Sequence, residues 1–428
     1  MSKTTKLLFK IKNHMNTYFL LYTYVHINCS LKRALIINTE TNKIVVTNNI
    51  HFISAYNELK QPTTHYMIKV NKNALEDLDF MKLLDKMEIE HFGEYIYTKE
   101  ENKPIQFSPQ IKINNKDPEI RNNLPNNSKE RNKFKIAISD EIGNNILDNI
   151  FEISIYYSSL PEKLSASKVD VNKQYMYPIK SSSNTKFQEF ELLFNPQYSY
   201  NRLIEVNIIA GILNNNDIQY LENNIKKYFS NKIVNLFIPW TIYNQSKENL
   251  KSIVCLCKTI YVWHDGLLPS NLYPKLYSNQ KNLYLIDNEK DILELESEEI
   301  DSICPLYNGE NKKFIMSYLK FSEKDILEQK YTEQEIIVNK YINRNFFGEL
   351  SIFPNGDVYS CKNMKPLGNI KTHDIKYLTF EEMYNQRNWF LTRSNMHTCN
   401  NCVLNWLCPP VTNNELAIGY WTFCTKYR

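Results

Sequence analysis

Apolar and polar positions alternate in three short runs near the start of the chain, with the period of half-buried β-strands. These runs are residues 23–28, 33–38 and 43–47, and the tetrapeptide TETN links the last two. Residues 51–59 and 74–87 then space their apolar side chains as amphipathic helices do. Short strands followed by helices predict a small winged-helix-like module over residues 1–103.

A polar stretch follows at residues 104–133, rich in Asn, Lys and Pro and with little hydrophobic periodicity. We interpret it as a linker or a long surface loop, and an ordered insertion is the alternative.

Strand and helix patterns alternate in the next region, residues 134–345. The candidate strands are residues 151–157, 203–210, 233–240, 259–263, 282–286 and 303–307. Helical stretches separate several of them, for example residues 217–229. Such alternation is typical of βα units around a parallel sheet, and it favours an α/β fold with a partial, open βα barrel. Functional groups in such folds lie at the C-terminal ends of the strands.

The remaining residues, 346–428, contain five of the nine cysteines. The region opens with the sequence GELSIFPNGDVYSC, whose apolar alternation and Asn355-Gly356 pair predict a β-hairpin.

Bulk composition narrows the classes of protein. The chain has 428 residues, 43% of them hydrophobic, which is enough for two or three domains. A net charge of +4 is too small to favour a nucleic-acid partner. The apolar residues 18–25 are too few to span a bilayer and lack a cleavage signal, so we expect a cytoplasmic protein without a membrane span. Cysteines in a reducing compartment are metal ligands or core thiols more often than disulfides.

Four cysteines near the C-terminus have the spacing Cys-x2-Cys-x5-Cys-x15-Cys. They are Cys399, Cys402, Cys408 and Cys424. A Cys-x2-Cys pair can place two thiolates on one metal, and the other two cysteines can close a four-thiolate site. Four thiolates suit either zinc or an iron–sulfur cluster, and spacing does not choose between them. Burial as plain core cysteines is the remaining alternative.

The same region resembles the SPASM domain, the C-terminal extension of radical S-adenosylmethionine peptide maturases. The matching elements are GELSIFPNGDVYSC, PLGNI, TFEEMYN with Trp389 and Arg393, CNNCVLNWLC, and Cys424. Full SPASM domains carry two auxiliary four-iron clusters. This chain lacks the family's cysteine before Gly356 and the one just beyond Cys408. The resemblance therefore implies a single 4Fe-4S cluster on Cys399, Cys402, Cys408 and Cys424, with Cys361 as an extra ligand or a buried thiol.

Radical S-adenosylmethionine enzymes need a Cys-x3-Cys-x2-Cys loop after the first barrel strand. Here that loop reads YSSLPEKLSASK and has no cysteine, so S-adenosylmethionine is not expected as a cofactor. The other cysteines are scattered, and burial as small hydrophobic groups is the expected role of Cys255 and Cys257.

Taken together, the chain resembles the pseudo-radical-SAM proteins of GG-type peptide systems in Bacteroidales. This resemblance implies a non-catalytic accessory protein in the maturation of a ribosomally synthesised peptide. Its expected partners are a precursor peptide and a partner maturase or transporter, and the N-terminal module resembles winged-helix elements that bind leader peptides by strand addition. Two alternatives are a redox-active peptide-modifying enzyme or electron carrier that uses the cluster, and a structural zinc scaffold.

One further pair of residues carries candidate chemistry. His264 and Asp265 follow a predicted strand and could serve as an acid and a base in a cleft. The Asp265-Gly266 pair is also a common turn, which is the alternative interpretation.

Overall fold

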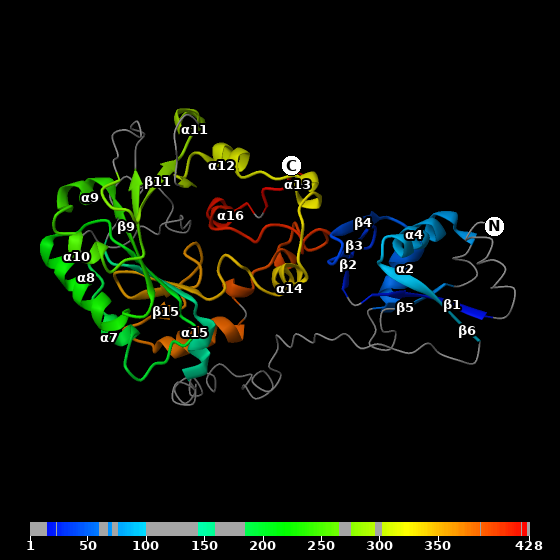
Figure 1. Cartoon of the computed structure of the whole chain (residues 1–428), viewed down its shortest axis with the longest axis horizontal. Coiled ribbons are helices and arrows are strands. Elements are labelled where there is room, and N and C mark those ends of the chain that lie inside the picture. The colour runs from blue at the N-terminus through cyan, green and yellow to red at the C-terminus, as the bar shows by residue number, and fades with distance from the viewer. Residues whose placement is uncertain are drawn as a thin grey trace. The chain divides into compact units, whose positions relative to one another are not determined.

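The protein is represented by a computed structural model (Figure 1). It describes residues 15–22, 24–59, 67–70, 76–99, 144–158, 185–264, 275–295, 302–385, 387–420 and 422–425. The chain forms two compact units, each assembled from separated stretches. Unit 1 comprises Met1–Asp117, Ser322–Tyr341 and Arg393–Pro409, and unit 2 comprises Pro118–Phe321, Ile342–Thr392 and Pro410–Arg428. The predicted linker, residues 104–133, lies outside the described residues, and the predicted domain boundaries stay predictions.

Two small antiparallel sheets form the N-terminal part of unit 1. One has the order β5-β1-β6 and the other β2-β3-β4. Their strands are β1 (Met15–Leu21), β2 (Val25–Cys29), β3 (Ala34–Asn38), β4 (Lys43–Thr47), β5 (Met67–Val70) and β6 (Gly93–Lys99). Helices α2 (Ile50–Leu59) and α4 (Leu78–Ile89) complete it. The three predicted strands and both predicted helices are confirmed, whereas β1, β5 and β6 were not predicted.

Helix α4 shows how the sequence builds this part of the chain. The side chain of Asp77 caps the helix by accepting hydrogen bonds from the backbone N–H groups of Asp79 and Phe80. Phe80, Leu84 and Met87 then recur at helical spacing on one buried face. Burial of each such side chain contributes about 1.5–3 kcal/mol to folding.

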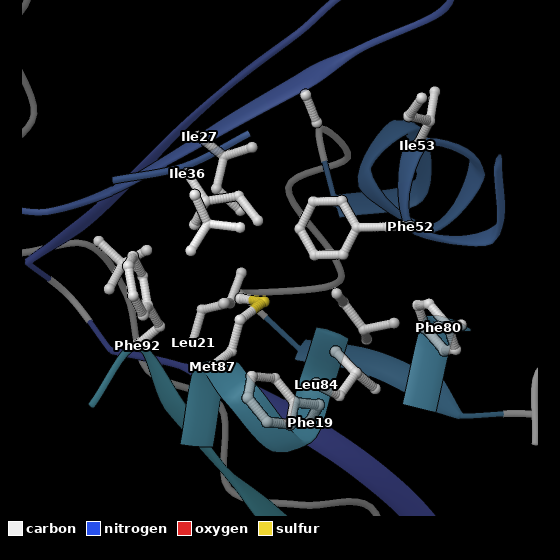
Figure 2. Packing of buried hydrophobic residues seen from close by; sticks show 14 of the residues in the cluster. Phe19, Leu21, Ile27, Ile36, Phe52, Ile53, Phe80, Leu84, Met87 and Phe92 are labelled. Carbon is white, nitrogen blue, oxygen red and sulfur yellow. The ribbon is translucent and has the colours of Figure 1, made fainter. Parts of the chain in front are cut away.

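The buried face of α4 belongs to a core shared by both sheets and both helices (Figure 2). Phe19 comes from β1, Ile27 and Ile36 from the second sheet, and Phe52 from α2. One core therefore joins the two sheets and the two helices.

The β2-β3-β4 sheet is buried on both faces. Ile27 and Ile36, which lie opposite each other, point into the shared core. Side chains alternate along a strand, so Leu35 and Ile37 lie on the other face, and they are 0% and 1% exposed. This second face carries His26, Asn28, Arg33, Leu35 and Ile37, and we call it the Asn28 face of the sheet.

Unit 2 is built on a nine-stranded sheet of order β12-β11-β10-β9-β8-β7-β13-β14-β15. Its strands are β7 (Glu152–Tyr156), β8 (Glu205–Ile209), β9 (Ile233–Pro239), β10 (Thr259–His264), β11 (Gln280–Ile286), β12 (Ser302–Pro305), β13 (Glu349–Ile352), β14 (Asp357–Tyr359) and β15 (Gly368–Asn369). All neighbours from β12 to β13 are parallel, and the last two pairs are antiparallel. The α/β class and all six predicted strands of this region are confirmed. The partial barrel of this region stays a prediction, as does the winged-helix-like module over residues 1–103.

Helices lie between and after the strands of the sheet. They are α7 (Phe190–Leu193), α8 (Asn215–Tyr228), α9 (Trp240–Ser246), α10 (Lys251–Val254), α11 (Glu289–Leu295), α12 (Lys312–Tyr318), α15 (Ile375–Asn385) and α16 (Asn413–Ile418), with 3-10 turns η1 (Asn144–Asn149) and η3 (Asn388–Phe390). In unit 1, the later stretches form α13 (Glu323–Leu327), α14 (Glu333–Tyr341) and η4 (Arg393–Asn395). None of the helices in the described part of the chain has the length and apolar composition needed to cross a membrane.

The predicted hairpin is present as β13 and β14. Gly356 in its turn has φ +94°, a conformation that side-chain-bearing residues rarely adopt. β13 pairs in parallel with β7, so the hairpin extends the sheet of unit 2.

Candidate metal centre

Three of the predicted thiol ligands lie on one short, turn-rich segment of unit 1. Cys399, Cys402 and Cys408 are 4%, 9% and 7% exposed. The N–H of Cys402 donates to the carbonyl of Cys399 (2.9 Å), and the N–H of Cys408 donates to the carbonyl of Leu404 (3.1 Å). An i to i+3 hydrogen bond closes a turn whose end Cα atoms lie within about 7 Å, as a Cys-x2-Cys pair requires. We call residues 399–408 the cysteine loop.

A cation and a phenol lie close enough to the cysteine loop to interact with its charges. Arg33 has a raised pKa, mainly because it donates hydrogen bonds to Glu323; burial opposes this, and the charges of Glu323 and Cys402 add to it. Burial is also the main cause of the raised pKa of Tyr331, and the charge of Cys408 contributes.

The fourth predicted ligand, Cys424, belongs to unit 2. It is 7% exposed and forms a parallel β-bridge with Phe321, and its N–H donates to the hydroxyl of Thr422 (3.0 Å). The adjacent Phe423 packs in a core with Tyr284 from β11. Cys424 is therefore held by the sheet of its own unit.

Cys361 also belongs to unit 2 and directly follows the hairpin. It is 3% exposed, and its thiol donates to Oδ1 of Asn413 at 3.4 Å. Burial raises the pKa of Cys361 to about 12. A neutral thiol with an internal acceptor matches the buried-thiol alternative for this residue.

The donor chemistry of the cysteine loop fits a thiolate-bound group. Across the described residues, no three His, Cys, Asp or Glu side chains are gathered closely enough to hold a metal ion. The three loop thiols are nevertheless buried and close in sequence. Sulfur donors of this kind hold zinc or iron–sulfur clusters.

Comparison with known families identifies one region. Residues 344–403 match the SPASM family, an iron–sulfur cluster-binding domain. No curated protein matches the chain. The match includes Cys361, Cys399 and Cys402 and ends before Cys408 and Cys424. We call residues 344–403 the SPASM-like segment, and its presence supports iron–sulfur binding by the C-terminal region.

A buried carboxyl group organises the part of the SPASM-like segment that lies in unit 2. Glu382 of α15 is 0% exposed and accepts hydrogen bonds from the Ser360 hydroxyl (2.5 Å) and the Trp389 backbone N–H (2.7 Å). The Trp389 indole in turn donates to the Glu349 carbonyl (3.0 Å). Burial raises the pKa of Glu382. These bonds fix α15 against the hairpin that carries Cys361.

His264, one of the two predicted cleft residues, is packed inside unit 2. It is 2% exposed, its ring stacks on Tyr284 with centroids 4.9 Å apart, and its Nε2 lies 3.3 Å from Oδ1 of Asn282. Asp265 lies outside the described residues.

Sequence inspection missed a row of carboxyl groups on the sheet of unit 2. Glu349, Glu152 and Glu205 stand at matching positions on the neighbouring strands β13, β7 and β8. Burial raises the pKa of Glu152 to about 7, and the charges of Glu349 and Glu205 add to this effect. Each of the three is the first residue of its strand, a signal that becomes meaningful only once the strand register is known.

Proposed function

We propose that this chain is a non-catalytic, radical-SAM-like accessory protein in the maturation of a ribosomally synthesised peptide. It acts in the cytoplasm and holds one 4Fe-4S cluster on Cys399, Cys402, Cys408 and Cys424. The observation that carries this proposal is the SPASM match over a segment with buried, closely spaced thiols.

The chain's own residues would hold the cluster without leaving an iron open. Four thiolates occupy the four irons of such a cluster, so no iron remains free to bind S-adenosylmethionine. The sequence after β7 offers no second set of three cysteines. The cluster therefore serves structure or electron transfer in this proposal.

The N-terminal module would bind the precursor peptide. Among the described strands, β5 and β6 are the outer strands of one sheet, and β2 and β4 those of the other. An outer strand can accept an extended peptide through main-chain hydrogen bonds, which suits a flexible leader sequence. A partner maturase or transporter would then receive the captured peptide.

The first test is metal analysis of anaerobically purified protein. We expect about four irons per chain, little zinc, and the absorbance of a four-iron cluster. Stoichiometric zinc without iron after anaerobic reconstitution would reject the cluster and favour the zinc scaffold.

The second test concerns catalysis. Reconstituted, reduced protein is incubated with S-adenosylmethionine, and 5′-deoxyadenosine is measured. We expect none above a control without protein. Turnover that persists after removal of any co-purifying maturase would overturn the non-catalytic proposal.

A second candidate function is electron transfer or redox modification of a peptide. Rapid oxidation of the reduced cluster by a partner maturase would support this candidate.

A further inference from the structure

The Asn28 face of the β2-β3-β4 sheet contacts parts of unit 1 that are far away in sequence. Nε2 of His26 lies 3.4 Å from Oε1 of Glu333 on α14. The guanidinium of Arg33 forms an ion pair with the carboxylate of Glu323 on α13. Asn28 lies between them on the same face, opposite the buried Leu35. This face is therefore an internal surface of unit 1.

Asn28 holds the middle of the cysteine loop through its side-chain amide. Its Nδ2 donates to the carbonyl of Val403 at 2.8 Å and to Oδ1 of Asn405 at 2.7 Å. Asn405 is 4% exposed, and its own Nδ2 donates to the carbonyl of Cys399 at 3.3 Å. Two amides in series thus connect β2 to the backbone on both sides of Cys402.

Arg33 is held rigidly at the edge of the same face. Its backbone N–H donates to the hydroxyl of Ser30 (3.1 Å), and its carbonyl accepts from the Ser30 N–H (2.8 Å). Its guanidinium donates to both carboxylate oxygens of Glu323, and the bond from Nη1 to Oε2 is 3.3 Å long. This ion pair anchors the sheet to α13 within unit 1.

Other bonds hold the far end of the loop. Nδ2 of Asn339 on α14 donates to the carbonyl of Trp406 (3.0 Å), and Nζ of Lys340 lies 4.5 Å from the Trp406 ring. Nε of Arg393 donates to the carbonyl of Pro409 (2.7 Å). The loop is therefore fixed at its end by α14 and η4, and its middle depends on Asn28.

We propose that the N-terminal sheet is part of the cluster site, with Asn28 positioning the cysteine loop. This inference rests on the proposed iron–sulfur function. Cys29, the neighbour of Asn28, takes no part, because strand alternation turns it toward the shared core, where it packs.

Hydrogen bonds that orient the ligand-bearing backbone govern how well the loop retains metal. Asn28 should therefore control iron retention.

Asn28→Asp tests the positioning role. The substitution keeps the size of the side chain but replaces the donor Nδ2 with an oxygen that faces the Val403 carbonyl. The matched control is Asn38→Asp in the same sheet: Asn38 is 0% exposed, and its Nδ2 donates to the His91 carbonyl (2.7 Å) in place of the cysteine loop. We expect Asn28→Asp to lose most of its iron during gel filtration and Asn38→Asp to retain it. Equal iron contents in the two variants would overturn the positioning role.

A metal-free measurement separates this inference from the proposed function. In apo-protein, alkylation of Cys399, Cys402 and Cys408 is followed by mass spectrometry. Asn28→Asp should accelerate alkylation of these thiols several-fold more than Asn38→Asp does. If wild-type protein binds no cluster, the proposed function fails, and the alkylation rates still decide whether Asn28 holds the loop.

Discussion

The thiol of Cys361 donates a hydrogen bond to Oδ1 of Asn413, with 3.4 Å between the two atoms. This bond joins the end of the hairpin to the start of α16 inside unit 2. This contact supports a structural role for the Cys361 thiol, in contrast to the ligand role proposed for the cysteines of the cysteine loop.

The first prediction compares Cys361 with Cys402. Cys361→Ala should keep the iron content near the wild-type value and destabilise unit 2 by about 1 kcal/mol, through a small cavity and one lost hydrogen bond. Cys402→Ala should lose the cluster and unfold the cysteine loop, because metal binding contributes folding free energy. Iron analysis and denaturant titration measure both effects. Complete loss of iron in Cys361→Ala would assign it as a ligand.

The second prediction concerns pH. The pKa of Glu152 is raised to about 7 in the folded chain, above the ordinary value of 4.5, first because of burial. The folded state therefore holds the proton more tightly than the unfolded state, so the contribution of Glu152 to stability is full below about pH 4.5 and is lost as the pH rises through 7. Glu152→Gln should remove roughly 1–3 kcal/mol of the stability difference between pH 5 and pH 8.

The measurement for this prediction is urea unfolding of unit 2 at several pH values. Glu310→Gln is the control, because Glu310 is exposed, and its curve should follow that of the wild type. An unchanged pH profile in Glu152→Gln would show that the carboxyl row does not control the pH dependence.

The third prediction uses two glycines with positive φ. Gly356 has φ +94°, and a Cβ atom there would lie 2.9 Å from Oδ1 of Asn369. Gly419 has φ +67° with no atom within 4 Å of its Cβ position. Both substitutions by alanine strain the backbone, by about 1–2 kcal/mol, but only Gly356→Ala adds a steric clash. Thermal unfolding should therefore show a larger loss for Gly356→Ala, and equal losses would contradict the role of Asn369.

The fourth prediction concerns the cap of α4. Asp77→Ala removes two hydrogen bonds to the first turn of the helix and should destabilise unit 1 by about 1 kcal/mol. Asp79→Ala is the control, since the side chain of Asp79 is exposed. Denaturant unfolding followed by far-UV circular dichroism measures both, and a smaller effect at Asp77 than at Asp79 would argue against the cap.

The strands of unit 2 could be predicted because buried parallel strands are rich in apolar residues, as in β9 and β10. The strand β6, with the sequence GEYIYTK, could not, because its pairing with β1 is set by residues about 80 positions away. The same limit applies to the site. The spacing of Cys399, Cys402 and Cys408 is visible in the sequence. The hydrogen bond from Asn28 to Val403 is not, because it joins residues that are 375 positions apart.

The pairing of β13 with β7 has a consequence for how the chain is made. Glu349 pairs with Glu152, and it is the 197th residue that the ribosome adds after Glu152. At roughly 5–20 residues per second, β7 emerges about 10–40 s before its neighbour. During that interval its backbone N–H and C=O groups on that side lack the partner they have in the finished sheet, which is the condition that favours aggregation of nascent chains. Slow translation or a shortage of chaperones should therefore reduce the yield of this protein.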